Sequence, residues 1–178
     1  MINNFKKFGI GALHFGIYYN KEDVKKLFSK SKINNIKWID TSPLYGEGNS
    51  EKIISELKNE TKDLYIATKF GLSRKLIGKN KYKLFLEKFN SNKIENSINK
   101  SLKNLNREKI DLFQLHGIDN TIDYHNLIFK LKKIKQKGKF KNFGVCNFNP
   151  SQLKKIIKVS KELNFKIDSC QLHLNFIE

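Results

Sequence analysis

The stretch IDTSPLYGEGNSE, residues Ile39 to Glu51, decides how the rest of the chain is interpreted. It begins at the end of an apolar run, IKWID, which predicts a buried strand that finishes at Asp40. Tyr45 follows in a glycine-containing loop, and a helical pattern begins near Ser50. The stretch therefore places a carboxylate and a phenol close together at the end of one strand, which makes this loop a candidate catalytic corner.

Apolar runs and helical periodicities alternate along the chain. Several runs are short and lack alternation of apolar and polar residues, which is typical of strands buried on both faces of a parallel sheet. We predict strands at 8–16, 36–39, 64–68, 110–115, 143–146 and 167–172, and helices over 20–32, from Ser50, from Ser91, over 121–137 and from Asn149. The basic segment 70–92 has no clean period, and we expect a loop or partial helix over one end of the fold.

Two closures fit this alternation, a doubly wound sheet and a (β/α) barrel. The first strand and its turn, FGIGALHFG, lack the GxGxxG spacing of a dinucleotide-binding doubly wound sheet. Polar residues follow one strand after another: Asp40, Lys69, His116 and Asn147. A barrel gathers all such strand ends around one mouth, so the pattern favours the barrel.

The composition limits the partners that we expect. The net charge is +18 over 178 residues, but the lysines are spread over every predicted helix and no nucleic-acid-binding motif occurs, so we expect solvated helix faces and no specific nucleic-acid partner. No apolar stretch is long enough for a transmembrane helix, so we expect no membrane partner. The two cysteines, Cys146 and Cys170, form no disulfide framework and indicate the reducing cytoplasm.

The strand ends carry groups for one kind of chemistry. An unperturbed tyrosine has a pKa of about 10, and a neighbouring Lys69 ammonium would lower the pKa of Tyr45. Asp40 would hold the lysine charged, and His116 would hydrogen-bond a substrate oxygen. The set fits protonation of a carbonyl oxygen as hydride reaches the carbon, and it fits hydrolysis poorly because no nucleophile–base pair or metal cluster accompanies it. We interpret His14 as a loop histidine, with contact to a ligand as the alternative.

Each of the four residues also has a structural interpretation when taken alone. Asp40 could cap the Asp-Thr-Ser-Pro turn, Tyr45 could pack in its loop, Lys69 could be a surface lysine and His116 an interior histidine. Four such residues at the ends of three successive strands are harder to attribute to chance. Their combination therefore favours a site.

Four segments of the chain resemble the aldo-keto reductase family. IDTSPLYGEGNSE resembles its aspartate-to-tyrosine signature, YIATKFG its lysine strand, SLKNLNREKIDLFQLHG its helix-then-strand segment ending in histidine, and GKFKNFGVCNF its GxIRxIGVSNF segment. The likeness runs from FGIGALHFG to SCQLHLN. The resemblance implies an α/β fold of the TIM (β/α)8 type, incomplete, with about six of eight βα units in a single domain, 1–178, that lacks its C-terminal part.

The resemblance also assigns catalytic roles. Tyr45 would be the general acid, Lys69 its pKa-lowering partner, Asp40 the partner of the lysine, and His116 the residue that orients the substrate carbonyl. The implied activity is NAD(P)H-dependent reduction of aldehydes or ketones to alcohols, or the reverse oxidation, on a small-molecule substrate. The alternative is an inactive, regulatory or binding remnant of the same scaffold, since some relatives serve as regulatory subunits of potassium channels.

The cofactor assignment follows from the same resemblance. The family uses NADPH more often than NADH and holds the nicotinamide carboxamide with the Ser-Asn of GVSN and a glutamine on the next strand. Those positions are Cys146, Asn147 and Gln171 here. Cys146 departs from the pattern and is only a weak hydrogen-bond donor. The two absent strands carry most of the dinucleotide site in the family, so we expect a truncated frame, a remnant, or a second chain that completes the barrel.

This interpretation makes a first prediction. The purified 178-residue chain should bind NADPH weakly or undetectably, because the segments that hold the pyrophosphate and the 2′-phosphate in the family are absent from it. Fluorescence titration with NADPH measures this directly. Micromolar affinity would contradict the claim that those segments are needed for binding.

Overall fold

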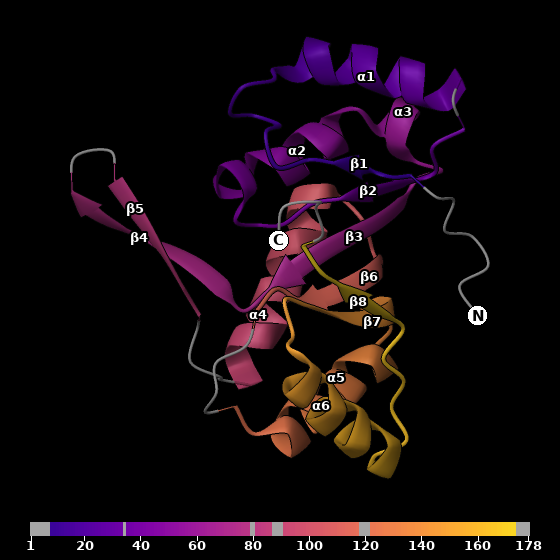
Figure 1. Ribbon diagram of the computed structural model, residues 1–178. Coiled ribbons are helices and arrows are strands. Elements are labelled where there is room, and N and C mark those ends of the chain that lie inside the picture. Colours follow the sequence, from indigo (N-terminus) through magenta and orange to yellow (C-terminus); the bar gives the residue numbers. More distant parts are fainter. Residues whose placement is uncertain (1–7, 34, 79–80, 87–90, 118–121, 174–178) are drawn as a thin grey trace.

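A computed structural model describes residues 8–33, 35–78, 81–86, 91–117 and 122–173 (Figure 1). Six strands form one parallel sheet in the order β1-β2-β3-β6-β7-β8, and two more form an antiparallel hairpin. The strands are β1 (Ile10–Gly11), β2 (Trp38–Asp40), β3 (Tyr65–Phe70), β4 (Leu72–Gly78), β5 (Lys81–Leu86), β6 (Ile110–Leu115), β7 (Phe140–Cys146) and β8 (Ser169–Gln171). The helices are α1 (Lys21–Ile33), the 3₁₀ helix η1 (Tyr45–Gly48), α2 (Asn49–Glu56), α3 (Lys58–Thr61), α4 (Ser91–Leu105), α5 (Tyr124–Gln136) and α6 (Pro150–Glu162).

The six-stranded sheet is curled, and the fold is an incomplete TIM barrel. All five strand pairings of this sheet are parallel. Neighbouring strands are also consecutive in the sequence, apart from the hairpin strands β4 and β5, which lie between β3 and β6 in the chain. In Figure 1, α1 to α3 lie beside β1 and β2, whereas α5 and α6 lie at the other end beside β7 and β8. The barrel prediction is confirmed, with β1 and β8 as the outer strands of the sheet.

Strand β6 lies at the centre of the core. All six of its residues are buried, as expected for a strand covered on both faces. Its Phe113 ring stacks on Phe70 with 4.5 Å between the ring centres and packs against Phe140 at 5.7 Å. These contacts join three neighbouring strands through one line of aromatic side chains.

Most of the predicted helix faces are buried. The inward residues of α4 and α5 were all predicted: Ile94, Ile98, Leu102 and Leu105 on α4, and Leu127, Ile128, Leu131 and Ile134 on α5. The apolar spacing of the sequence also predicts inward positions for Leu27 on α1 and Ile157 on α6, and these two predictions are wrong because both side chains are exposed. Each sits one position away from a buried residue, Phe28 and Ile156 respectively, and so falls on the outer side of its helix.

The helix starts agree with the sequence at α1, α4 and α6, whereas α5 begins at Tyr124 with Asp123 as its cap, after the predicted start at residue 121, and α2 also differs. The Asn20 side chain accepts hydrogen bonds from the first turn of α1, and Asn149 forms a capping box with Gln152 at α6. The sequence also indicates Ser50 as the N-terminal cap of the helix after the Tyr45 loop, and this prediction is wrong because α2 begins one residue earlier and has no side-chain cap. Ser50 instead donates to the Ala12 carbonyl at 2.9 Å, which ties the helix to the end of β1.

The expectation of a loop or partial helix over 70–92 is also wrong. Residues of this segment form the β4–β5 hairpin, with Leu72 opposite Leu86. Figure 1 shows that the hairpin projects away from the six-stranded sheet. At its base Leu86 lies against Gly117, where an added Cβ would come within 2.7 Å of the Leu86 side chain. The hairpin therefore starts directly after β3 and rests on the loop after β6.

A buried glutamate braces the loop that carries Tyr45. Glu51 has no exposed surface, yet both carboxylate oxygens have partners. Thr68 Oγ1 of β3 donates to Oε1 at 2.7 Å, and Asn104 Nδ2 of α4 donates to Oε2 at 2.9 Å. Because these bonds satisfy a buried acceptor, Glu51 joins α2, β3 and α4 just beyond the end of the Tyr45 loop.

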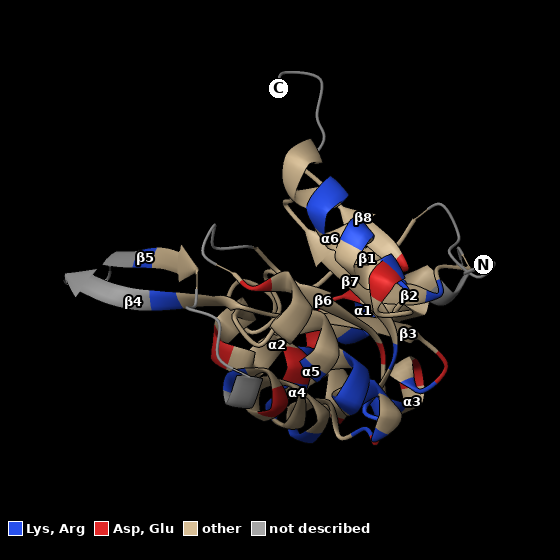
Figure 2. Cartoon of the chain, turned by 90° about the horizontal axis from the view of Figure 1, so that it is seen from below, with Lys and Arg blue, Asp and Glu red and all other residues tan. Residues whose placement is uncertain are grey.

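The charged side chains show no single basic face. Figure 2 shows Lys and Arg on several helices and strands, with Asp and Glu interspersed. Within the described ranges, no helix is both long and apolar enough to cross a membrane. The same part of the chain contains no group of three or more His, Cys, Asp or Glu residues placed to hold a metal ion.

We predict that Glu51→Ala destabilises the fold far more than Glu56→Ala on the same helix. The first change strands the Thr68 hydroxyl and the Asn104 amide, at a cost of about 1–3 kcal/mol for each unpaired buried group. Glu56 forms an exposed ion pair with Lys21, and such pairs contribute about 0–1 kcal/mol. Urea unfolding followed by circular dichroism compares the two variants. Equal midpoints would rule out the bracing role of Glu51.

Candidate active site

A buried ion pair joins the ends of β2 and β3. Asp40 ends β2, and Lys69 lies near the end of the neighbouring parallel strand β3. The Lys69 Nζ lies 2.6 Å from each Asp40 carboxylate oxygen and 3.0 Å from the Thr41 carbonyl oxygen. The lysine is only 2% exposed. Lys69 is therefore no surface lysine, and Asp40 serves the lysine rather than a turn.

Tyr45 reaches the same lysine from the loop after β2. Its hydroxyl lies 3.3 Å from Lys69 Nζ, and the ammonium also faces the tyrosine ring, 5.0 Å from its centre. The turn chemistry of the loop belongs to Ser42, whose carbonyl accepts from Tyr45 N and whose hydroxyl accepts from Leu44 N. Gly46 continues the turn at φ 56°. The turn thus presents the phenol to the ion pair.

The pKa of Tyr45 is raised above its ordinary value of about 10. Burial is the main cause, and it outweighs the opposing effect of the Lys69 ammonium, while the Asp40 carboxylate raises the pKa further. The prediction of a lowered pKa is therefore wrong in its net direction, although the effect of Lys69 has the predicted sign. The phenol keeps its proton at neutral pH, and it can donate that proton.

His116 completes the group from the third strand end. Its backbone N–H donates to the Phe70 carbonyl at 2.8 Å, and its ring meets the Tyr45 ring edge-on with 6.0 Å between centres. Burial, with a smaller effect from Lys69, lowers the pKa of His116 to about 4. The imidazole is therefore neutral at neutral pH, where it can offer one N–H donor and one acceptor.

The three predicted cofactor residues lie together on β7 and β8. Cys146 Sγ donates to Gln171 Oε1 at 3.3 Å, and Asn147 N donates to the Gln171 carbonyl at 3.0 Å. The Asn147 side chain donates to the His116 carbonyl at 2.9 Å, which links this group to the catalytic group. Burial raises the pKa of Cys146 to about 12, so the thiol stays protonated.

These side chains suit a nicotinamide carboxamide only in part. A carboxamide needs a donor for its oxygen and an acceptor for its amide, and Gln171 carries both kinds of group. The Cys146 thiol and the Asn147 amide nitrogen already donate within the protein. The Gln171 amide nitrogen, with the second N–H and the carbonyl oxygen of the Asn147 side chain, therefore fits a carboxamide better than the Cys146 thiol does.

Sequence reasoning missed two features of this region. Glu51 belongs to the stretch IDTSPLYGEGNSE, but no role was predicted for it from the sequence. Its position in the first turn of a helix that follows a strand end is the signal that could have indicated a buried bridging carboxylate. The hairpin after β3 was missed altogether. His14, in contrast, is an exposed loop residue whose ring packs against Tyr18, with 5.1 Å between ring centres.

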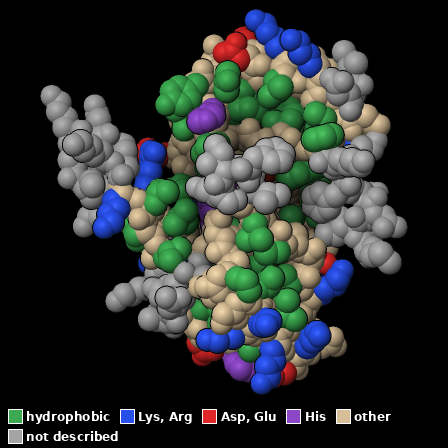
Figure 3. Space-filling model, in the orientation of Figure 1, with side chains coloured by type: hydrophobic (Ala, Val, Ile, Leu, Met, Phe, Trp, Pro, Cys, Tyr) green, Lys and Arg blue, Asp and Glu red, His purple; other side chains and the backbone are tan. Residues whose placement is uncertain are grey.

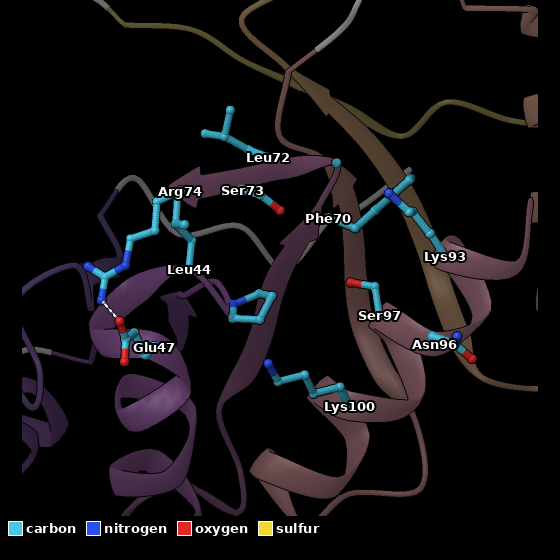
Figure 4. A pocket seen from close by; sticks show the side chains of 12 residues that line it. Leu44, Glu47, Phe70, Leu72, Ser73, Arg74, Lys93, Asn96, Ser97 and Lys100 are labelled. Atoms are coloured by element: carbon cyan, nitrogen blue, oxygen red, sulfur yellow. Dashed lines mark hydrogen bonds and ion pairs between the residues drawn. The ribbon is translucent and has the colours of Figure 1, made fainter. Parts of the chain in front are cut away.

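A cavity of about 690 Å³ adjoins the site behind the Tyr45 loop. Figure 4 shows the Glu47–Arg74 ion pair at one end of the cavity, and Lys93 and Lys100 on the α4 side. Its walls come from the residues just before Tyr45, the start of the hairpin and one face of α4: Pro43, Leu44, Glu47, Phe70, Gly71, Leu72, Ser73, Arg74, Lys93, Asn96, Ser97 and Lys100. None of the four predicted catalytic residues lines this cavity.

Comparison with known proteins points to one family. The sequence profile of the Aldo/keto reductase family matches residues 7–178. The uncharacterized oxidoreductase YqkF of Bacillus subtilis is 30% identical over 155 residues, which are 85% of this chain and 48% of that protein. An aldo-keto reductase of Pseudocercospora fijiensis is 28% identical over 128 residues, covering 72% of this chain and 41% of its own length.

Solved structures agree with the sequence comparison. Glycerol dehydrogenase AKR11B4 from Gluconobacter oxydans has a TM-score of 0.78 at 28% identity, covering 96% of this chain and 52% of that one. The holo form of aldo-keto reductase AKR11C1 from Bacillus halodurans has the same fold, with a TM-score of 0.77 over 94% of this chain and 53% of its own. The chain spans about half the length of these relatives. With a family profile that matches nearly all of its residues, the chain belongs to the aldo/keto reductase family.

Proposed function

We propose that the chain carries the catalytic corner of an NAD(P)H-dependent oxidoreductase that reduces aldehydes or ketones to alcohols, or catalyses the reverse oxidation. The observation that carries the proposal is the buried series Asp40–Lys69–Tyr45, which ends in a protonated phenol beside His116. Membership of the family supports carbonyl oxidoreduction as the reaction class.

Each group of the corner has one task in this proposal. Tyr45 donates its proton to the carbonyl oxygen as negative charge develops there. Lys69 stabilises the phenolate that remains, because an ammonium at 3.3 Å favours the charged form of the phenol. Asp40 pairs with the lysine through both carboxylate oxygens, which compensates its charge in a buried place. His116 is neutral, so it orients the carbonyl oxygen by hydrogen bonding rather than by proton transfer.

The hydride is the part of the chemistry that a nicotinamide cofactor supplies when bound. We propose NADPH, with NADH as the second choice, and we assign Gln171, Asn147 and Cys146 to the side of the carboxamide. Contact between Cys146 and Gln171 supports this grouping. The proposal also includes a second chain that supplies the rest of the barrel, in the cytoplasm, where the two free cysteines would remain reduced.

Where the parent chain reduces a ketone at high NADPH concentration, replacing Tyr45 by Phe should remove that activity and leave the fold intact. The change deletes the acidic proton, and positioned acid catalysis contributes about 10²–10⁴-fold to the rate. NADPH oxidation, followed by its absorbance at high cofactor and ketone concentrations, measures the loss. Tyr124→Phe is the matched control, because Tyr124 is a partly buried tyrosine at the start of α5 and lies outside the corner.

Two outcomes would count against this assignment. A Tyr45→Phe chain that reduces ketones as fast as the parent chain would reject the tyrosine as the acid. Equal losses in both tyrosine variants would show that the assay reports general damage rather than the missing proton.

The neutral state of His116 gives a pH prediction. Its pKa of about 4 lies below the ordinary 6.5, so the unfolded chain binds this proton first as the pH falls. The stabilising contribution is therefore complete above pH 6.5 and is lost as the pH falls from about 6.5 towards 4. His116→Gln should flatten the loss of stability over that window, as measured by urea unfolding at several pH values. An unchanged pH profile would contradict a neutral, half-buried His116.

A further inference from the structure

Two buried hydroxyl groups lie next to the ion pair and have no task in the chemistry described above. In Figure 3, hydrophobic and charged side chains are both spread over the visible face, so this face does not distinguish one patch from another. Thr41 and Ser50, in contrast, have no exposed surface, and we call these two residues the hydroxyl pair. Their hydroxyl oxygens lie 2.8 Å apart. Because a buried hydroxyl finds its hydrogen-bond partners within the fold, those partners show what the pair holds in place.

The direction of the hydrogen bond within the hydroxyl pair follows from a count of protons. A serine hydroxyl carries one proton, and Ser50 Oγ lies 2.9 Å from the Ala12 carbonyl oxygen, which can only accept. Ser50 therefore donates to Ala12, and the Thr41 hydroxyl donates to Ser50 Oγ. Ala12 is itself fixed at the end of β1, because its N–H donates to the Asp40 carbonyl at 2.8 Å.

Thr41 is held through all three of its polar groups. Its N–H donates to the Ala67 carbonyl of β3 at 2.9 Å, and its hydroxyl donates to Ser50. Its carbonyl oxygen accepts from Lys69 Nζ at 3.0 Å. A residue that is bound through both its N–H and its side chain has little freedom to turn, so the carbonyl oxygen stays beside the lysine.

The Thr41 carbonyl completes the set of acceptors around the lysine. An ammonium group has three N–H donors. Among the described residues, Lys69 Nζ has three acceptor oxygens within 3.0 Å, namely both Asp40 carboxylate oxygens and the Thr41 carbonyl. The Tyr45 hydroxyl lies further away, at 3.3 Å. If the Thr41 carbonyl moved, the ammonium would lose one of its three nearest partners and could shift relative to Tyr45.

We propose that Thr41 and Ser50 are positioning residues, which hold the Lys69 ammonium within reach of the Tyr45 hydroxyl. Ser50 acts through Thr41, and Ala12 anchors both residues to the end of β1. The importance of this placement for turnover rests on the proposed function, in which Lys69 stabilises the phenolate of Tyr45. Catalytic groups must be held within about 0.5 Å of their productive positions, and the hydroxyl pair supplies that restraint from outside the corner.

Solvent exchange of the Lys69 ammonium protons tests the proposal on the full chain, without cofactor or turnover. NMR of isotope-labelled protein detects a lysine ammonium where burial and hydrogen bonds slow this exchange, and the signal that is lost in Lys69→Arg identifies Lys69. Ser50→Ala should speed the exchange about two- to tenfold, because the hydrogen bond that fixes Thr41 is lost. Absence of a Lys69 signal in the parent chain would overturn the proposal, since a held ammonium exchanges slowly.

Matched variants separate the hydroxyl from general damage. Thr41→Val should speed the exchange as Ser50→Ala does, because valine keeps the branched shape and lacks the hydroxyl, whereas Thr41→Ser keeps the hydroxyl and should keep the slow exchange. Ser31→Ala is the control, because Ser31 on α1 is also buried and donates to a backbone carbonyl, that of Phe28, at 2.8 Å. Urea unfolding checks that each variant is folded, and the two Thr41 variants decide the question if Ser50→Ala does not fold.

The outcomes separate this inference from the proposed function. A folded Ser50→Ala or Thr41→Val chain in which Lys69 exchanges as slowly as in the parent would overturn the inference. An equal acceleration in Ser31→Ala would also overturn it, by showing general loosening, and so would one in Thr41→Ser, which retains the hydroxyl. If Lys69 exchange responds to the hydroxyl pair while Tyr45→Phe reduces ketones at the parent rate, the positioning of Lys69 stands and the proposed reaction fails.

Discussion

The buried pair of Asp40 and Lys69 is the interaction on which the candidate site depends. The pair is possible because β2 and β3 are parallel neighbours that end at the same edge of the sheet, so that both side chains reach one point. A buried ammonium without a carboxylate would be costly, and so would the reverse. The second oxygen acceptor, the Thr41 carbonyl, comes from the residue after Asp40. The end of β2, the turn that follows it and the neighbouring strand β3 thus position one cation, Lys69.

Burial, more than the cation, determines the proton states of the groups around Lys69. Tyr45 and Cys146 remain protonated because burial raises the pKa of both groups, and His116 remains neutral because burial and Lys69 lower its pKa. The corner therefore contains one compensated ion pair and otherwise neutral groups that carry protons. Such a set is poor at nucleophilic attack and well suited to meeting negative charge that develops on an oxygen atom.

Most of the architecture could be predicted from the sequence, because local pattern and tertiary packing agree. The mostly apolar run of β6, IDLFQL, and the three- and four-residue spacing of α4 and α5 each have one reasonable interpretation. The convergence of Asp40, Lys69, Tyr45 and His116 was predictable too, since parallel strands share an end. The capping prediction for Ser50 failed because the partner of its hydroxyl, the Ala12 carbonyl, lies 38 residues away in the sequence. The predicted direction of the Tyr45 pKa shift was wrong because burial, which causes the shift, depends on the whole fold and not on neighbouring residues in the sequence.

The β4–β5 hairpin shows a second limit of prediction from sequence. It also has a consequence for how the molecule can change during evolution. Lys81 and Lys83 alternate with Tyr82 and Leu84 before the apolar pair Phe85 and Leu86, so a strand signal exists but resembles the lysine-rich background. Among the described residues, β4 and β5 pair with each other and with no strand of the main sheet. The hairpin can therefore lengthen, shorten or exchange its surface without altering the register that holds the ion pair. In evolutionary terms it is a separable module, through which selectivity could diverge while the chemistry stays constant.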